Sequence, residues 1–143
     1  MNKRREKLKL TLSQAEAIIS FAKSKMMDLG VKMSLSVTDS RGDLIAMVRS
    51  DGASWRTPTI SKGKAVAAAC FGQSTKELES RASSPIFQAF TVAENGIFIM
   101  GQGALPVYQE GELIGAVGAS GGTPVEDEEV VAYGISQVGL SYM

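Results

Sequence analysis

The sequence of 143 residues contains no histidine. This absence excludes Ser-His-Asp and Cys-His catalysis, histidine general bases, HExxH zinc sites and the usual proximal ligand of haem iron. Any chemistry must therefore use carboxylates, Lys, Tyr, Cys, Met, backbone groups or a bound cofactor. No protein-bound metal is expected.

The sequence also contains only one cysteine and has a formal net charge of zero. The single cysteine, Cys70, excludes an intramolecular disulfide framework, which fits a reducing compartment. Its small apolar neighbours predict a buried structural thiol. Lys plus Arg and Asp plus Glu are balanced at 15 each, so no excess of positive charge is available for nucleic-acid phosphates or a membrane surface. We expect neither nucleic acid nor membrane as a partner.

Long apolar runs are missing as well. The basic start MNKRREKLK is not followed by the apolar run of about 7 to 15 residues that a signal peptide needs. A membrane helix would need about 20 apolar residues, and no such span is present. The sequence therefore predicts a cytoplasmic protein. Residues 1–10 are interpreted as a basic tail and residues 11–143 as one domain, because no repeat or linker divides the chain.

The periodicity of the remaining residues predicts an alternation of helices and strands. Caps and helical spacing indicate helices over residues 11–30, 57–72 and 123–139, with shorter ones from 74 and 85. Strand patterns cover residues 31–38, 44–48, 97–100, 105–109 and 112–119. The expected fold class is α/β (α+β), a three-layer α/β/α sandwich around an antiparallel sheet of about five strands, in the order α-β-β-α-α-β-β-β-α.

Several local details refine this prediction. Thr11 and Ser13 each fit a capping box at the start of the first helix, and Thr57 is the expected cap of the Ala-rich helix. The segment LIAMVR is apolar at nearly every position, so both its faces are expected to be covered by helices or by another subunit. The glycines of GQGALP lack the third glycine of a dinucleotide fingerprint and indicate a tight turn.

Residues 112–129, ELIGAVGASGGTPVEDEE, join a strand to a helix through small residues and end in consecutive acids. Backbone N–H groups at Gly121 and Gly122 would suit a phosphate or carboxylate. Alternatively, Thr123 and Glu126 form a capping box, and the acids only offset the positive end of the helix dipole. Both interpretations stay open.

The loop RSDGASWR carries charged and aromatic side chains at the end of an apolar strand. Arg49, Asp51 and Trp55 would make a pocket rim, because guanidinium groups bind carboxylates and an indole stacks on flat ligands. The alternative is an Arg49–Asp51 pair that only rigidifies a turn. In the following helix, Lys62 and Lys64 lie on different faces. A buried Lys64 would be a candidate base or Schiff-base former, whereas a solvated lysine is the ordinary case.

Three ordered groups of segments carry a family resemblance. They are VTDSRGDLIAMVRSDGA, then KA with FGQST, and finally GQGALPVYQEGELIGAVGASGG with EDEE. Together they resemble the GlcG/HbpS/PduO C-terminal family over about residues 11–140. The resemblance implies a profilin-like α/β/α domain that forms homo-oligomers, from dimers up to octamers. It also implies haem binding or degradation, redox sensing, or a link to cobalamin and to glycolate, diol or glycerol utilisation.

The residues that match the family pattern are Asp39, Gly42, Arg49, Asp51, Gly52, Lys64, Gly103, Pro106, Gly121, Gly122 and Asp127. Haem-binding relatives use an axial histidine, which this chain lacks. Haem would therefore need a Met, Tyr or Cys ligand, or a pocket without a protein ligand. The adenosyltransferase catalytic domain is also absent, so the resemblance does not extend to corrinoid adenosylation.

The leading hypothesis is an oligomeric small-molecule-binding or accessory protein for a flat or anionic ligand, haem or corrinoid by resemblance. Its expected ligand-binding residues are Arg49, Asp51, Trp55, Gly103, Gly121 and Gly122. One alternative is a small metabolic enzyme in which Lys64 is the catalytic base and Arg49 binds a carboxylate. Another is a purely structural assembly partner.

Overall fold

The computed structural model describes residues 7–143, so most of the expected basic tail lies outside the described residues. Of its last four residues, Leu10 is buried in the core and the Leu8 N–H donates to Glu112. The elements in chain order are α1 (Leu12–Leu29), β1 (Ser34–Asp39), β2 (Leu44–Arg49), α2 (Thr57–Phe71), α3 (Thr75–Ala82), α4 (Pro85–Ala93), β3 (Ala104–Gln109), β4 (Glu112–Ser120) and α5 (Pro124–Gln137).

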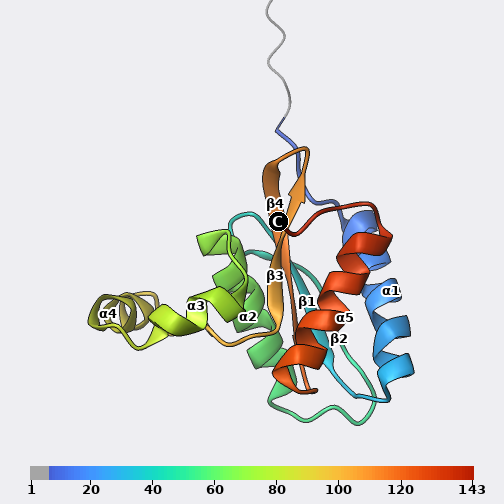
Figure 1. The fold of residues 1–143 in the computed structure, drawn as a ribbon, viewed down its shortest axis with the longest axis horizontal. Coiled ribbons are helices and arrows are strands. Elements are labelled where there is room, and N and C mark those ends of the chain that lie inside the picture. Colours follow the sequence, from blue (N-terminus) through green and yellow to red (C-terminus); the bar gives the residue numbers. More distant parts are fainter. Residues whose placement is uncertain (1–6) are drawn as a thin grey trace, which may run out of the picture.

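The sheet has the order β2-β1-β4-β3, and each neighbouring pair is antiparallel. Helices α1 and α5 cover one face and α2 covers the other (Figure 1). The three-layer α/β/α fold with an antiparallel sheet is therefore confirmed. Among residues 7–143, no helix is both long and apolar enough to cross a membrane.

The strand expected at residues 97–100 was wrong, and the described sheet has four strands rather than about five. Phe98 instead packs against Phe71 and Phe90, with ring centroids 5.3 Å apart in each pair. The Ile99 N–H donates to the Gly63 carbonyl of α2, not to a neighbouring strand. Three helices, α2, α3 and α4, separate β2 from β3, in agreement with the helices expected over residues 57–72 and from 74 and 85.

The predicted caps were mostly right. Thr11 and Gln14 form the capping box of α1, so Thr11 rather than Ser13 is the N-cap. The cap predicted at Thr57 was wrong. The N-cap of α2 is Arg56, whose guanidinium has no acceptor for a backbone N–H, and the Thr57 hydroxyl donates to the Ser54 carbonyl oxygen.

The two faces of the sheet differ in chemistry. The face toward α1 and α5 is apolar, with buried Leu35, Val37 and Val117. The opposite face carries small and hydroxyl residues against the Ala-rich α2. A Cβ added to Gly118 would collide with the Ser61 carbonyl oxygen of that helix, so the small residues allow α2 to lie directly on the sheet.

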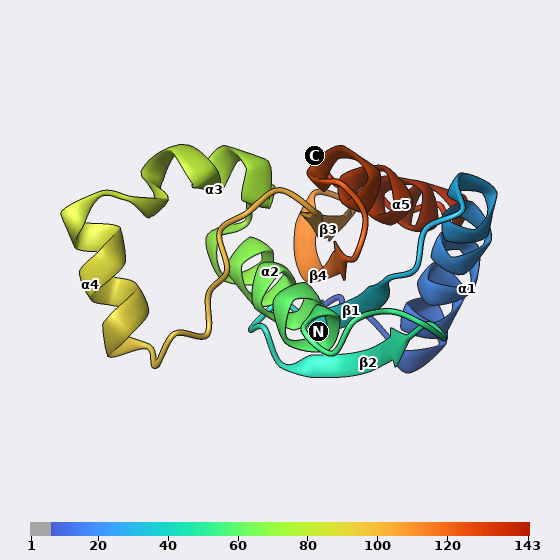
Figure 2. The same cartoon turned by 90° about the horizontal axis from the view of Figure 1, so that it is seen from below.

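Two apolar surfaces remain outside this core. Strand β2 lies at the edge of the sheet, and its Leu44 and Met47 side chains are exposed. Residues 7–143 therefore do not cover both faces of β2, and coverage by another subunit stays a prediction. Helices α3 and α4 extend away from the sheet as an arm (Figure 2), and α4 has no buried residue. Exposed Ile86 and Val92 lie on this arm.

Candidate functional site

A cleft of about 600 Å³ lies where four segments meet: the end of α1, the loop between β2 and α2, the start of α2 and the turn between β4 and α5. It is termed the junction cleft. It is lined by Gly30, Val31, Lys32, Gly52, Ala53, Ser54, Arg56, Thr57, Ile60, Ser120, Gly121 and Gly122. The cleft thus brings together two segments that the sequence singled out, the loop after β2 and the glycines after β4.

The three side chains expected at the pocket rim do not line this cleft. Arg49, Asp51 and Trp55 are exposed, and Trp55 is 81% exposed. No ion pair joins Arg49 to Asp51 within residues 7–143, so the rigid-turn alternative finds no support. The wall is formed instead by their neighbours in the same loop. Ligand binding by Arg49, Asp51 and Trp55 stays a prediction.

Hydroxyl groups fix the position of the α2 start against the sheet. The Thr57 hydroxyl donates to the Ser54 carbonyl oxygen at 2.8 Å, and the Ser34 hydroxyl lies 2.8 Å from Thr57 Oγ1. Since the Thr57 proton is already used, Ser34 is the donor in that second bond. The loop, α2 and β1 are therefore joined at the cleft wall.

The β4–α5 turn contains two glycines, of which Gly121 excludes a side chain. Gly121 has a φ of +139°, and a Cβ there would collide with the Lys32 carbonyl oxygen. The Gly122 N–H donates to Asp127 Oδ1 at 2.9 Å. That N–H group is consequently not free for a ligand.

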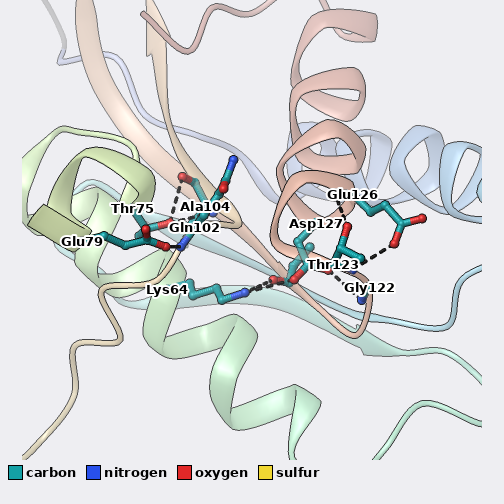
Figure 3. A network of polar contacts seen from close by, with 10 residues as sticks. Lys64, Thr75, Glu79, Gln102, Ala104, Gly122, Thr123, Glu126 and Asp127 are labelled. Atoms are coloured by element: carbon teal, nitrogen blue, oxygen red, sulfur yellow. Dashed lines mark hydrogen bonds and ion pairs between the residues drawn. The ribbon is translucent and has the colours of Figure 1, made fainter.

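The acids that follow serve the start of α5 (Figure 3). The Thr123 N–H donates to Glu126 Oε1 at 2.9 Å, and the Glu126 N–H donates to Thr123 Oγ1 at 3.2 Å. This reciprocal capping box supports the structural interpretation of the acidic run. Side chains of this protein therefore already accept hydrogen bonds from backbone N–H groups at the start of α5.

Lys64 is buried, so the interpretation of this residue as an ordinary solvated lysine was wrong. Its Nζ donates to the Ala119 carbonyl oxygen at 3.0 Å and to Asp127 Oδ2 at 3.1 Å (Figure 3). The Lys64 and Asp127 side chains are 9% and 4% exposed. Burial raises the pKa of the Asp127 carboxyl, an effect partly offset by Lys64 and by the Gly122 N–H.

Gly103 lies over this ion pair. Its φ is +139°, and an added Cβ would lie 2.6 Å from Lys64 Nζ and 3.0 Å from the Ala119 carbonyl oxygen. Gly103 and Lys64 are not among the residues that line the junction cleft. The structure therefore places them in a buried polar contact between α2, β4 and α5, beside the cleft wall.

Sequence reasoning missed Asp127 as the partner of Lys64, because the two residues are far apart in the chain. One signal could have found the burial of Lys64. Ser61, Lys64, Ala65 and Ala68 share one helical face, and the small members of that set mark the face that packs on the sheet.

The prediction for Cys70 was also wrong, because the thiol is exposed. The residue lies in the last turn of α2, where only part of the side chain is covered. Partial burial, followed by the negative charges of Glu94 and Asp43, raises the pKa of the Cys70 thiol. A raised pKa lowers the thiolate fraction and disfavours a nucleophilic role.

A second cleft, of about 750 Å³, lies beside β3 and is termed the β3 cleft. Its lining includes Tyr108, Tyr142 and Met143, side-chain types that ligate haem iron in other proteins. The Tyr108 hydroxyl donates to the Gly72 carbonyl oxygen at 2.8 Å. The junction cleft, by contrast, has no Met, Tyr or Cys in its lining, so its residues do not fit iron ligation.

The chain is a small α/β/α domain with one cleft where four segments meet and another beside β3. Residues 10–136 match the family described as haem degrading protein HbpS-like, and the chain belongs to this family. The recognition made from the sequence segments is confirmed.

Three similar proteins illustrate the range of the family. An uncharacterised 15.0 kDa protein of the dhaT-dhaS intergenic region of Citrobacter freundii is 34% identical over 134 residues, 92% of this chain and 93% of that protein. Protein GlcG of Escherichia coli K12 is 34% identical over 116 residues, 80% of this chain and 84% of GlcG. The crystal structure of a PduOC:heme complex has a TM-score of 0.86 at 20% identity, covering 94% of this chain and 99% of that one, which shows a shared fold.

Proposed function

We propose that this chain is a cytoplasmic, homo-oligomeric accessory protein that binds an anionic small molecule, tetrapyrrole-like by family, in the junction cleft. The observation that carries the proposal is the convergence of the loop after β2 with Gly121 and Gly122 across that one cleft. The heme complex of the PduOC relative supports the tetrapyrrole class. The family resemblance also suggests service in glycolate, diol or glycerol utilisation.

A tetrapyrrole in the junction cleft would be held through its carboxylates rather than through iron. Lys32 and Arg56 line the cleft and carry the charge that propionate groups require. The cleft lining offers no Met, Tyr or Cys side chain as an axial ligand for haem iron. In the β3 cleft, Tyr142 and Met143 would be the ligands of an iron-bound haem.

The arm formed by α3 and α4 supports homo-oligomer formation. Helix α4, PIFQAFTVA, contains no charged residue and has exposed Ile86, Phe90 and Val92. An exposed apolar surface of this kind is typical of a protein–protein contact. The outer edge strand β2 offers a second apolar surface on the same chain.

The enzyme alternative, with Lys64 as base and Arg49 as carboxylate ligand, stays a prediction. Lys64 is held in a buried ion pair by two acceptors, and Arg49 is exposed on β2. Neither residue lines the junction cleft.

The proposal is tested by titrating the purified protein with haemin and following the Soret band. We expect a saturable shift at a fixed stoichiometry per subunit. Ala53→Trp, which fills the junction cleft, should abolish the shift, whereas the control Lys76→Trp, which fills the β3 cleft, should leave it unchanged. No saturable shift with the wild-type protein would overturn the tetrapyrrole assignment. Loss of the shift only in Lys76→Trp would overturn the choice of cleft.

A further inference from the structure

We propose that the junction cleft contains an oxyanion subsite, formed by the N-terminus of α2 with Ser120, Lys32 and Arg56, that binds a carboxylate or phosphate group. The inference rests on the proposed function in taking this cleft as the ligand site. It does not require the ligand to be a tetrapyrrole.

The start of α2 differs from the start of α5 although the two helices are of similar length. The N-cap of α2, Arg56, makes no side-chain cap, and the first turn contains no acid. The start of α5 is capped by Thr123 and has Glu126 and Asp127 in its first turn. The partial positive charge of the helix dipole is therefore compensated at α5 and uncompensated at α2. Such an end favours an anion through its dipole, since the Thr57 N–H already donates to the Ser54 carbonyl oxygen and Pro58 has no N–H.

Ser120 supplies an independent observation. It is only 7% exposed, yet no residue that the structure describes bonds its hydroxyl. Within residues 7–143, every side-chain oxygen that is fully inaccessible to solvent has a hydrogen-bond partner. The Ser120 oxygen has none, so it must be partly accessible to solvent. Since Ser120 lines the junction cleft, the accessible oxygen faces that cleft.

The direction of the Ser120 side chain follows from the register of the sheet. Ser120 lies directly opposite Ser34 in the β1–β4 pair, and opposed residues point to the same face. The Ser34 hydroxyl meets Thr57 at the start of α2. The Ser120 hydroxyl therefore faces the uncapped end of α2, where it can donate to an oxyanion.

The charge of the cleft matches an anion. Its lining contains the cations Lys32 and Arg56 and no acidic residue. Within the described part of the chain, neither cation forms an ion pair. A Cβ added to Gly52 would lie 2.8 Å from Lys32 Nζ, so this glycine makes room for the ammonium group at the cleft wall. Two cations suit a phosphate or a dicarboxylate better than a neutral ligand.

The test is a titration of the ¹⁵N-labelled protein with inorganic phosphate, and separately with succinate, at constant ionic strength. We expect saturable amide shifts at Gly52 and Gly121 with at least one of the two anions, and the tighter binder identifies the group. Arg56→Gln and Ser120→Ala should each weaken binding at least about fivefold. Lys62→Gln removes an exposed charge from α2 outside the cleft and should leave binding unchanged.

Three results would overturn the subsite: no saturable binding of either anion, equal weakening by Lys62→Gln, or unchanged binding in Ser120→Ala. An unchanged unfolding midpoint in each variant separates these results from misfolding. Phosphate or succinate binding without a haemin-induced Soret shift would support the subsite and refute only the tetrapyrrole class. A haemin shift that Arg56→Gln and Ser120→Ala leave intact, together with no saturable binding of either anion, would support the tetrapyrrole and refute the subsite.

Discussion

Replacement of Lys64 by methionine should destabilise the protein far more than the same replacement of Lys25. Lys64 is 9% exposed and lies 3.1 Å from Asp127 Oδ2, whereas Lys25 is 28% exposed and lies 3.6 Å from Glu129 Oε1. The two substitutions remove the same charge and retain a long side chain. They differ in whether the abandoned carboxylate can be hydrated.

The magnitudes follow from that difference. Removing one partner of a buried ion pair leaves an uncompensated charge and costs about 3–5 kcal/mol. Asp127 is 4% exposed, so water cannot replace the Lys64 ammonium, and the Ala119 carbonyl oxygen loses its donor as well. The Glu129 side chain is 47% exposed, and an exposed pair of this kind contributes about 0–1 kcal/mol.

The assay is equilibrium urea unfolding at pH 7 and one protein concentration, with the free energy of unfolding taken from the linear extrapolation. The double variant Lys64→Met with Asp127→Asn should be more stable than Lys64→Met alone. It removes the unpaired charge and keeps an amide oxygen for the Gly122 N–H. A Lys64→Met loss no larger than that of Lys25→Met would refute the reasoning.

Three further predictions concern the Lys64–Asp127 contact and the α3–α4 arm. Gly103→Ala should lower the free energy of unfolding in urea by roughly 2–4 kcal/mol, because the added Cβ would lie 2.6 Å from Lys64 Nζ. In the control Gly101→Ala the added Cβ meets nothing within 4 Å, so the loss should be less than about 0.5 kcal/mol, and equal losses in the two variants would contradict the packing. The Asp127 carboxyl, followed by ¹³C NMR, should titrate above 3.8. The folded protein then holds its proton longer than the unfolded chain, so this group's contribution to stability falls as pH rises from about 4 through the folded pKa; a midpoint below 3.8 would show that the bond to Lys64 outweighs burial. Val92→Glu, which places a charge on the apolar arm, should lower the molar mass measured by light scattering, and an unchanged oligomer would exclude α4 from the contact.

Features encoded by neighbouring residues could be predicted from the sequence. The capping boxes of α1 and α5 depend on residues three positions apart, and the alternation of apolar and polar residues in the sequence of β1 depends on the next residue but one. The antiparallel sheet and the three layers follow from these elements and their short connections. The glycines of the β4–α5 turn and the loop after β2, both singled out in the sequence, border the junction cleft, whereas ligand binding by them stays a prediction.

Features that depend on the tertiary arrangement could not be predicted in the same way. IFIM has the composition of a strand, yet Phe98 packs in an aromatic cluster with Phe71 and Phe90. Lys64 and Asp127 meet across 63 residues of sequence, and Lys32 and Ser120 reach the cleft from separate elements. The rim side chains Arg49, Asp51 and Trp55 were chosen for their chemistry, but the backbone of that loop directs their neighbours Ser54 and Arg56 to the cleft.

The central claim is that the junction cleft, and not the β3 cleft, is the ligand site. The most direct measurement is the line broadening of backbone amide NMR signals during a haemin titration, because the paramagnetic iron broadens the nuclei closest to it. The account predicts that the amides of Gly52, Ser54 and Gly121 broaden first. Broadening that begins at Gly72 and Tyr108, with Gly52 and Gly121 unaffected, would place the ligand in the β3 cleft and contradict the claim.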